Sequence, residues 1–252
     1  MLPNKLRRSL RWFAPLAVLL VAGTLLLLTT PSSAKPSLAL DYLASEEIGL
    51  SAKGLDEPSG LALSTTTGEF WVISDDTSAV FKISPDNLKS IDTMPVSEGE
   101  MEAITLAEKE GHFFTVNESK GRIARFSMSD GKQLERQRIH KMSGYADISE
   151  SIKSAKSNSG FEGLAWHSER GTLFVAFEGP PGILVEISAD LKTIISSTPL
   201  TAERGFTDPK NDIIDFSGLS YDATRKRLWI LSDEASRVFL FDLETKQVTE
   251  SI

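Results

Sequence analysis

Cysteine is absent from this chain of 252 residues, and histidine is scarce. Without cysteine the protein forms no disulfide, no thiolate metal site and no thiol nucleophile. Its three histidines, His112, His140 and His167, lack the HxH or HExxH spacing that brings two imidazoles to one metal ion. A GxSxG nucleophile motif is also missing. Metal binding is therefore left to oxygen ligands, which suit hard cations such as calcium.

The chain also lacks an excess of basic residues. It has 27 Lys and Arg against 35 Asp and Glu, which gives a formal net charge of -8. A negative protein is repelled by the phosphate backbone, so we expect no nucleic acid among its partners. The acidic balance agrees with cation binding, although many soluble proteins share it without that role.

The first 36 residues have the pattern of a targeting segment. Four basic residues precede an apolar run from Trp12 to Leu28, and the small residues Ser32 and Ala34 follow it. This order is typical of a signal peptide cleaved after Ala34, and equally of an uncleaved signal anchor, a transmembrane helix. Both readings make the membrane a partner and export the rest. We expect a cell-envelope protein that is membrane-anchored on the periplasmic side, or secreted to the periplasm if the leader is cleaved.

Four similar units follow between residues 38 and 252. Each begins with a short block, which reads EPSGLAL, EMEAITL, GFEGLAW and DFSGLSY in turn. A turn and two further apolar runs follow each block, and a weaker fourth run closes the unit. Short runs rich in Val, Ile, Phe and Trp between turn residues predict antiparallel strands. Repeated small sheets bury their faces by stacking round an axis. We therefore predict an all-β protein, a β-propeller with four-stranded blades near 57–97, 100–140, 160–200 and 215–252.

Closure of the predicted ring is left open by the sequence. Residues 38–50, LALDYLASEEIGL, are predicted to form a leading strand of the kind that completes the last blade of a propeller. We see no further unit for it to join before Ile252. A missing carboxy-terminal blade or an open ring is the first interpretation, and closure with four blades is the alternative. A short helix is predicted within 145–156, between the second and third blades.

A pair of polar positions recurs at a constant interval in all four units. The first position, in the first run, is Ser59, Glu102, Glu162 or Ser217, and the second, after the second run, is Asp75, Glu118, Glu178 or Asp233; each pair is separated by 16 residues. A constant interval puts these side chains at equivalent points of every blade, near the channel or its rim. Carboxylates gathered there repel one another unless a cation, a raised pKa or backbone donors offset the repulsion. For Asp75 and Asp233, hairpin capping is the alternative interpretation.

Taken together, the motifs EPSGLAL, SGFEGLAWH, LFVAFEGPPGILVEI and DFSGLSYD…RLWILSDEASRVFLFD resemble the SdiA-regulated domain family, the YjiK-like bacterial proteins. The resemblance covers residues 38–252. It implies an exported or membrane-anchored β-propeller of five to six blades, which would make this chain truncated at its C-terminus. It also implies a calcium-type ion in the channel, with Glu102 and Glu162 as metal ligands and Glu118 and Glu178 behind them.

Three classes of function remain after these observations. The first is an envelope binding or interaction module whose partner is a small ligand, a glycan or another envelope protein. The second is a calcium-dependent hydrolase, lactonase- or phosphoesterase-like, in which Glu102 and Glu162 hold the metal and Asp75 or Asp233 is the base. The third is a scaffold whose acidic residues serve only in turns. His167, just past a first run, is a further candidate for the channel mouth.

Overall fold

The computed structural model describes residue 41 and residues 54–86, 90–154, 159–179, 182–208 and 215–252. These residues belong to one compact unit, Leu38–Ile252. The predicted leader at 1–36 lies outside the described residues, and so does the predicted strand at 38–50 apart from Asp41. In the part of the chain that is described, no helix has the length and apolar character needed to cross a membrane.

The described chain folds into four antiparallel sheets of four strands. The first sheet contains β1 (Pro58–Leu63), β2 (Phe70–Ser74), β3 (Ala79–Ile83) and β4 (Ser90–Pro95). The second contains β5 (Met101–Ala107), β6 (His112–Asn117), β7 (Arg122–Ser127) and β8 (Gln133–Arg138). The third contains β9 (Phe161–His167), β10 (Thr172–Phe177), β11 (Gly182–Ser188) and β12 (Ile194–Leu200). The fourth contains β13 (Gly218–Asp222), β14 (Arg227–Ser232), β15 (Arg237–Asp242) and β16 (Gln247–Ser251).

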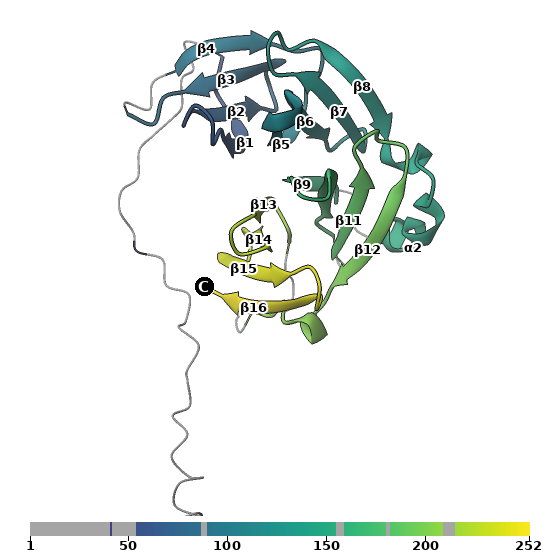
Figure 1. The fold of residues 1–252 in the computed structure, drawn as a ribbon. Coiled ribbons are helices and arrows are strands. Elements are labelled where there is room, and N and C mark those ends of the chain that lie inside the picture. Colours follow the sequence, from purple (N-terminus) through teal and green to yellow (C-terminus); the bar gives the residue numbers. More distant parts are fainter. Residues whose placement is uncertain (1–40, 42–53, 87–89, 155–158, 180–181, 209–214) are drawn as a thin grey trace, which may run out of the picture. The chain divides into compact units, whose positions relative to one another are not determined.

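The sheets are the blades of a β-propeller, as the sequence predicts. In every sheet the strands pair in chain order, so each blade is a simple meander. The first strands of the blades, β1, β5, β9 and β13, lie innermost, and the fourth strands lie outermost (Figure 1). Contacts join β1 to β5, β5 to β9 and β9 to β13. The inner strands of successive blades are therefore neighbours, and side chains on them can meet.

Three hydrophobic clusters join successive blades. Neighbouring residues of a strand point to opposite faces of the sheet, so β6 contributes to two of these clusters. Phe113 faces the first blade and meets Trp71 edge-on, with ring centroids 5.6 Å apart. Phe114 faces the third blade and stacks on Trp166, also at 5.6 Å. Because each blade needs its neighbours to bury both faces, the stacked arrangement follows from the apolar second strands.

A short helical insertion connects the second and third blades. The predicted helix within 145–156 is found as the 3-10 turn Tyr145–Asp147 followed by α2, Ser149–Ser154. Ile148, between them, is buried in the cluster that joins the two blades. Ser143 forms a parallel bridge with Thr193 just before β12. The insertion is therefore anchored to the third blade. Three further 3-10 turns lie at Glu108–Glu110, Ile139–Lys141 and Ala202–Arg204.

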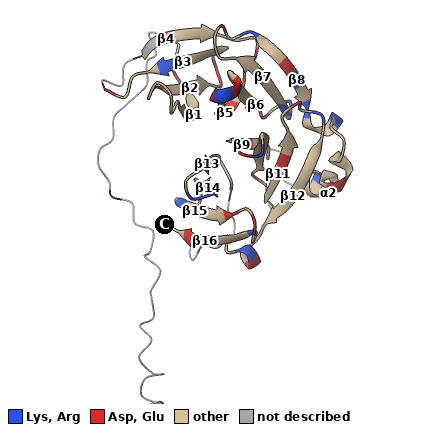
Figure 2. Ribbon diagram, viewed as in Figure 1, with Lys and Arg blue, Asp and Glu red and all other residues tan. Residues whose placement is uncertain are grey.

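The outer strands and the two end blades present different surfaces. The outer strand β8 carries charges of both signs (Figure 2), as its exposed positions require.

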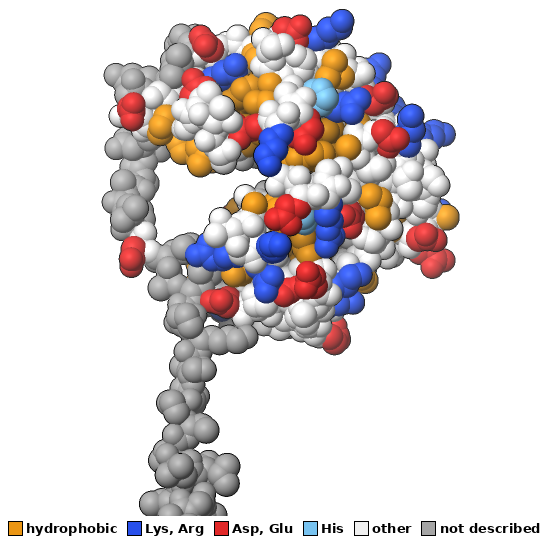
Figure 3. All heavy atoms as spheres, in the orientation of Figure 1, with side chains coloured by type: hydrophobic (Ala, Val, Ile, Leu, Met, Phe, Trp, Pro, Cys, Tyr) orange, Lys and Arg blue, Asp and Glu red, His pale blue; other side chains and the backbone are white. Residues whose placement is uncertain are grey.

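Hydrophobic side chains gather over the region of β1 and β5 in Figure 3. Leu61 of β1 is 58% exposed, whereas Ile104, at the same position of the second blade, is 3% exposed. Leu231 of β14 is 44% exposed, against 0% for its counterpart Ile73. Within the described residues no strand pairing joins the first sheet to the fourth; a blade number above four stays a prediction.

Candidate metal centre

A β-bulge places the first-strand residue of the repeated pair in three blades. In β5, Met101 pairs with Asn117 and Ala103 with Val116, so Glu102 is left between two register positions. The same irregularity leaves Glu162 unpaired in β9 and Ser59 unpaired in β1. A bulge bends the strand and redirects the side chain of the extra residue. The repeat therefore gives these three side chains an equivalent setting on the inner strand.

The acids of the second position directly follow the second strand of each blade. Strand β6 ends at Asn117 and β10 at Phe177, so Glu118 and Glu178 are the next residues. Asp75 and Asp233 occupy the same position after β2 and β14. The end of the second strand pairs with the start of the first strand in every blade. This pairing accounts for the constant interval of 16 residues in the sequence.

Three of the four predicted metal ligands come together between the second and third blades. Carboxylate oxygens of Glu118, Glu162 and Glu178 all lie within 4.8 Å of one another, and all three residues are half-buried. None of the ion pairs formed by the described residues includes any of the three. The cluster therefore gathers three acidic groups that no Lys or Arg in the described part of the chain pairs with.

The surroundings favour protonation of this cluster. Burial first, then the charges of Glu178 and Glu118 and a hydrogen bond with Glu178, together raise the pKa of Glu162 to about 8. Burial and the charge of Glu178 also raise the pKa of Glu118. A buried carboxyl next to other carboxyls resists ionisation because its charged form is both poorly solvated and repelled. A bound cation would remove both penalties.

Glu102 extends the acidic region toward the first blade without joining the group of three. Its pKa is raised by burial, then by the charges of Glu118 and Asp75. It also adds to the charge that raises the pKa of Glu162. Glu102 is therefore near enough to the cluster to interact electrostatically, but it does not belong to the set of converging oxygens.

Gly160, just before β9, holds two members of the cluster in place. Its N–H donates to Glu178 Oε1 at 3.2 Å, and its carbonyl accepts from the Glu178 N–H at 3.0 Å. A Cβ atom at Gly160 would overlap Cγ and Oε1 of Glu118. Glycine is the one residue type that leaves this space free while its backbone fixes Glu178. Gly160 is therefore a positioning residue for the cluster.

The SdiA-regulated family matches residues 42–251. The chain belongs to this family. The match covers all four blades and the carboxylate cluster. Among curated proteins no match was found.

Three solved structures are similar to this SdiA-regulated protein. Kuenenia stuttgartiensis hydrazine synthase is 14% identical with a TM-score of 0.50, and the alignment covers 75% of this chain and 53% of that one. The structure of U3-55K is 9% identical with a TM-score of 0.48, covering 76% and 50% of the two chains. A Bacteroides caccae protein of unknown function is 15% identical with a TM-score of 0.44, covering 72% and 56%. The SdiA-regulated chain spans about half the length of these structures.

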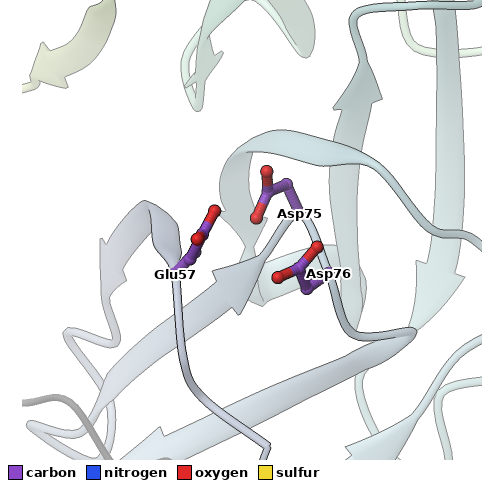
Figure 4. Close-up of side chains that lie close together, drawn as sticks. All are labelled: Glu57, Asp75 and Asp76. Atoms are coloured by element: carbon purple, nitrogen blue, oxygen red, sulfur yellow. The ribbon is translucent and has the colours of Figure 1, made fainter.

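A second group of acids lies at the first blade of this SdiA-regulated protein. Glu57, Asp75 and Asp76 have carboxylate oxygens within 4.8 Å of one another, and Figure 4 shows them across the start of β1 and the end of β2. One oxygen of Asp75 is buried without a hydrogen-bond partner among the described residues. Glu57 and Asp76 are exposed. Neither residue is among the sequence-predicted candidates, although the letters SDD mark the place.

The fourth blade shows what the equivalent of Glu57 does in a turn. Asp215, its counterpart, accepts a hydrogen bond from Ser232 Oγ at 2.6 Å and another from the Glu234 N–H at 3.0 Å. Asp233 is exposed and belongs to neither acid group; its carbonyl accepts from the Ser236 N–H. These contacts agree with the alternative interpretation, hairpin capping, for the fourth blade.

The remaining candidates are engaged in packing or in backbone contacts. Ser59 Oγ donates to the Met101 carbonyl, which ties β1 to β5. The Ser217 hydroxyl is buried with no partner among the described residues. His167 is 4% exposed and stacks on Tyr221 with ring centroids 3.9 Å apart. It stands at the opposite end of β9 from Glu162, and its pKa is lowered by burial, then by Arg170. His167 is therefore a packing residue, not part of the cluster.

A cavity of about 180 Å³ adjoins the cluster at Glu118. Its walls come from the loop after β6, from residues 139–152 before the third blade, from the start of β9 and from Phe177 at the end of β10. The sequence does not predict the cavity, because residues from four separated segments form it. His140 and Tyr145 line it together with Glu118, and no motif links these residues.

Proposed function

We propose that this member of the SdiA-regulated family binds a divalent cation of the calcium type through Glu118, Glu162 and Glu178, and that it acts as a ligand-binding module of the cell envelope. The observation that carries the proposal is the convergence of three half-buried carboxylates from two blades, which form no ion pair with any basic residue that the structure describes. An ion at this point would join the second blade to the third.

The donor set fits such an ion. Calcium prefers oxygen ligands at about 2.3–2.6 Å, so two ligands on opposite sides of the ion are separated by about 4.6–5.2 Å. The oxygens of the cluster lie within 4.8 Å of one another, which is compatible with one shared ion. Three carboxylates supply enough charge to offset the dehydration of a divalent cation. Glu102 adds negative charge nearby.

Other buried acids of this protein provide an internal comparison. Glu98 pairs with Arg122, Glu186 with Arg170, and Asp242 with Arg227. In each of these places the fold supplies a guanidinium to a shielded carboxylate, as the cost of burying a charge demands. The cluster has no such partner among the residues that the structure describes. This difference supports a binding role over a purely structural one.

The envelope part of the proposal rests on residues 1–36. Their basic flank and apolar run support export or anchoring, with the propeller on the periplasmic side. Cell fractionation of a tagged full-length chain tests this part. The proposal requires the protein in the membrane or periplasmic fraction and fails if it stays in the cytoplasm.

Thermal melting tests the cation. The full chain is melted in chelator, in calcium and in magnesium; we expect calcium to raise the melting temperature, because an ion that binds only the folded state stabilises it. Glu178→Gln is expected to remove most of the increase while keeping the acceptor for the Gly160 N–H. Asp233→Asn, at the same position of the fourth blade, is the control and keeps the increase. Equal melting curves with and without calcium in the wild-type protein contradict the proposal.

Calcium-dependent hydrolysis is the second candidate, favoured by one observation. The carboxylate cluster borders the cavity at Glu118, and a cation held there would polarise a carbonyl or phosphoryl oxygen of a substrate in that space. Turnover of generic lactone, ester and phosphoester substrates, lost in chelator and in Glu162→Gln, would establish it. If calcium stabilises the protein but none of these substrates is hydrolysed, the result supports the binding module instead.

A further inference from the structure

The cavity beside Glu118 is lined by apolar side chains on part of its wall, by polar residues such as His140 and Tyr145, and by one acidic residue. Phe161 and Phe177 form part of the wall, with ring centroids 5.1 Å apart, and Ile139 and Ile152 are also in contact with the space. Glu118 closes the side toward the cluster. Concave sites with apolar walls and a few polar groups at one end are the usual form of small-molecule sites.

We infer that this cavity binds a small organic acid, whose compact apolar body lies against Phe161 and Phe177 and whose carboxylate reaches the cation held at Glu118. This inference rests on the proposed function and adds to it the chemical class of the ligand. Of the cavity residues to which we assign ligand contacts, Glu118 is the one that was also a candidate from the sequence.

The volume sets the size of the ligand. A cavity of about 150 Å³ accommodates a benzene ring. The space of about 180 Å³ beside Glu118 therefore admits one six-membered ring, or a chain of similar volume, with a single polar group.

Basic residues flank one lining segment of the cavity. The segment that carries His140, a lining residue, also carries Arg138 and Lys141, all three exposed. Its position is fixed because the Ile139 N–H donates to the Gly121 carbonyl at 2.8 Å, beside the loop that follows Glu118. Basic residues near a site attract anionic ligands and speed their approach. Without the cation, Glu118 repels a carboxylate, so binding of the acid and of calcium must be linked.

Calorimetric titration of the full chain tests the inference with defined probes: benzoate and hexanoate as acids, benzyl alcohol as the neutral analogue and benzylamine as the cationic one. In calcium we expect benzoate or hexanoate to bind at least about tenfold more tightly than benzyl alcohol. In chelator we expect acid binding to be lost. If neither acid binds the calcium-loaded protein, or if benzylamine binds the calcium-free protein and competes with calcium, the inference is wrong.

A cavity-filling substitution separates the pocket from the ion site. Ser159 is half-buried in the cavity wall, so the variant Ser159→Trp fills the cavity with an indole ring. The matched control is Ser154→Trp, which places the same side chain on the exposed end of α2. We expect Ser159→Trp to weaken acid binding by at least about tenfold and to leave calcium affinity within about twofold. Unchanged acid binding in this variant contradicts the inference. A wild-type protein that binds no calcium instead contradicts the proposed function, so the two failures are distinguishable.

Discussion

The Glu118 side chain occupies the space where a side chain at position 160 would begin. A Cβ atom added to Gly160 would overlap Cγ and Oε1 of Glu118. The two residues come from different blades, and Gly160 also donates its N–H to Glu178. A backbone position without a side chain therefore brings acids from two sheets together.

Gly160→Ala is expected to disturb the cluster more than the fold. The added methyl group must displace Glu118, so calcium affinity should fall by at least about tenfold, which corresponds to about 1.4 kcal/mol. Titration calorimetry measures the change. Gly99→Ala is the control, because its Cβ would meet only the Ser78 hydroxyl, at 3.2 Å. Equal calcium affinity in Gly160→Ala and the wild-type protein would show that Glu118 is not a ligand.

The pKa of Glu162 predicts how calcium-free stability depends on pH. In the folded protein Glu162 holds its proton up to a pKa of about 8, whereas its ordinary value is 4.5. Between these values the folded state binds more protons than the unfolded state, so its contribution to stability falls as the pH rises from about 4.5 to about 8. Chemical denaturation in chelator across this window should show the loss, and Glu162→Gln should reduce it, leaving the contributions of Glu102 and Glu118, whose pKa values are also raised.

Two comparisons check that assignment. Saturating calcium should abolish or reverse the pH slope, because the ion binds the deprotonated carboxylates. Glu100→Gln should leave the slope between pH 4.5 and 8 unchanged, because the Glu100 pKa is lowered by hydrogen bonds from Ser119 and Lys120 and by the charge of Lys120. A wild-type slope that Glu162→Gln does not alter would mean that another group causes it.

A shielded ion pair near the cluster carries a stability prediction. Glu98 is 3% exposed and accepts hydrogen bonds from Arg122 and, at 3.2 Å, from Asn117 Nδ2. Removing one partner leaves a charge without compensation, so Glu98→Ala should lower the free energy of unfolding by about 3 kcal/mol. Urea denaturation measures it. Glu100→Ala, which removes an exposed pair with Lys120, should have a much smaller effect. Similar losses in the two variants would contradict this account.

The matched acids of the fourth blade give a specificity prediction. Asp233 follows β14 just as Glu178 follows β10, yet it is exposed and outside both acid groups. Calcium affinity should therefore be unchanged in Asp233→Asn and reduced in Glu178→Gln. Calorimetry on the two variants side by side compares the same position in two blades. A similar loss in both would favour a site that spans more blades.

The sequence predicted the blades because each blade repeats the same local pattern. Short apolar runs such as 112–117 and 172–177, bounded by turns with positive-φ glycines at Gly111 and Gly171, specify strands and their order without knowledge of distant contacts. The interval between Glu102 and Glu118 recurs in every unit, and it therefore predicted that the paired polar residues occupy equivalent positions in each blade.

The set of converging residues was harder to predict, because it depends on how the blades stack. Glu118, Glu162 and Glu178 meet, while Glu102 lies beside them and Asp233 lies apart, although all five follow the same repeat. The difference arises where the second and third blades approach and where Gly160 leaves space. The bulge at Glu162 and the cavity beside Glu118 have no signature in the sequence, since both depend on packing between separate segments.

Calorimetric titration of calcium into the full-length protein tests the central claim most directly. The wild-type chain is compared with the combined variant Glu118→Gln, Glu162→Gln and Glu178→Gln, which keeps the volume of the three side chains and removes their charge. The account predicts one calcium ion per wild-type chain and none in the variant. No binding to the wild-type chain, or equal binding to both proteins, would contradict it.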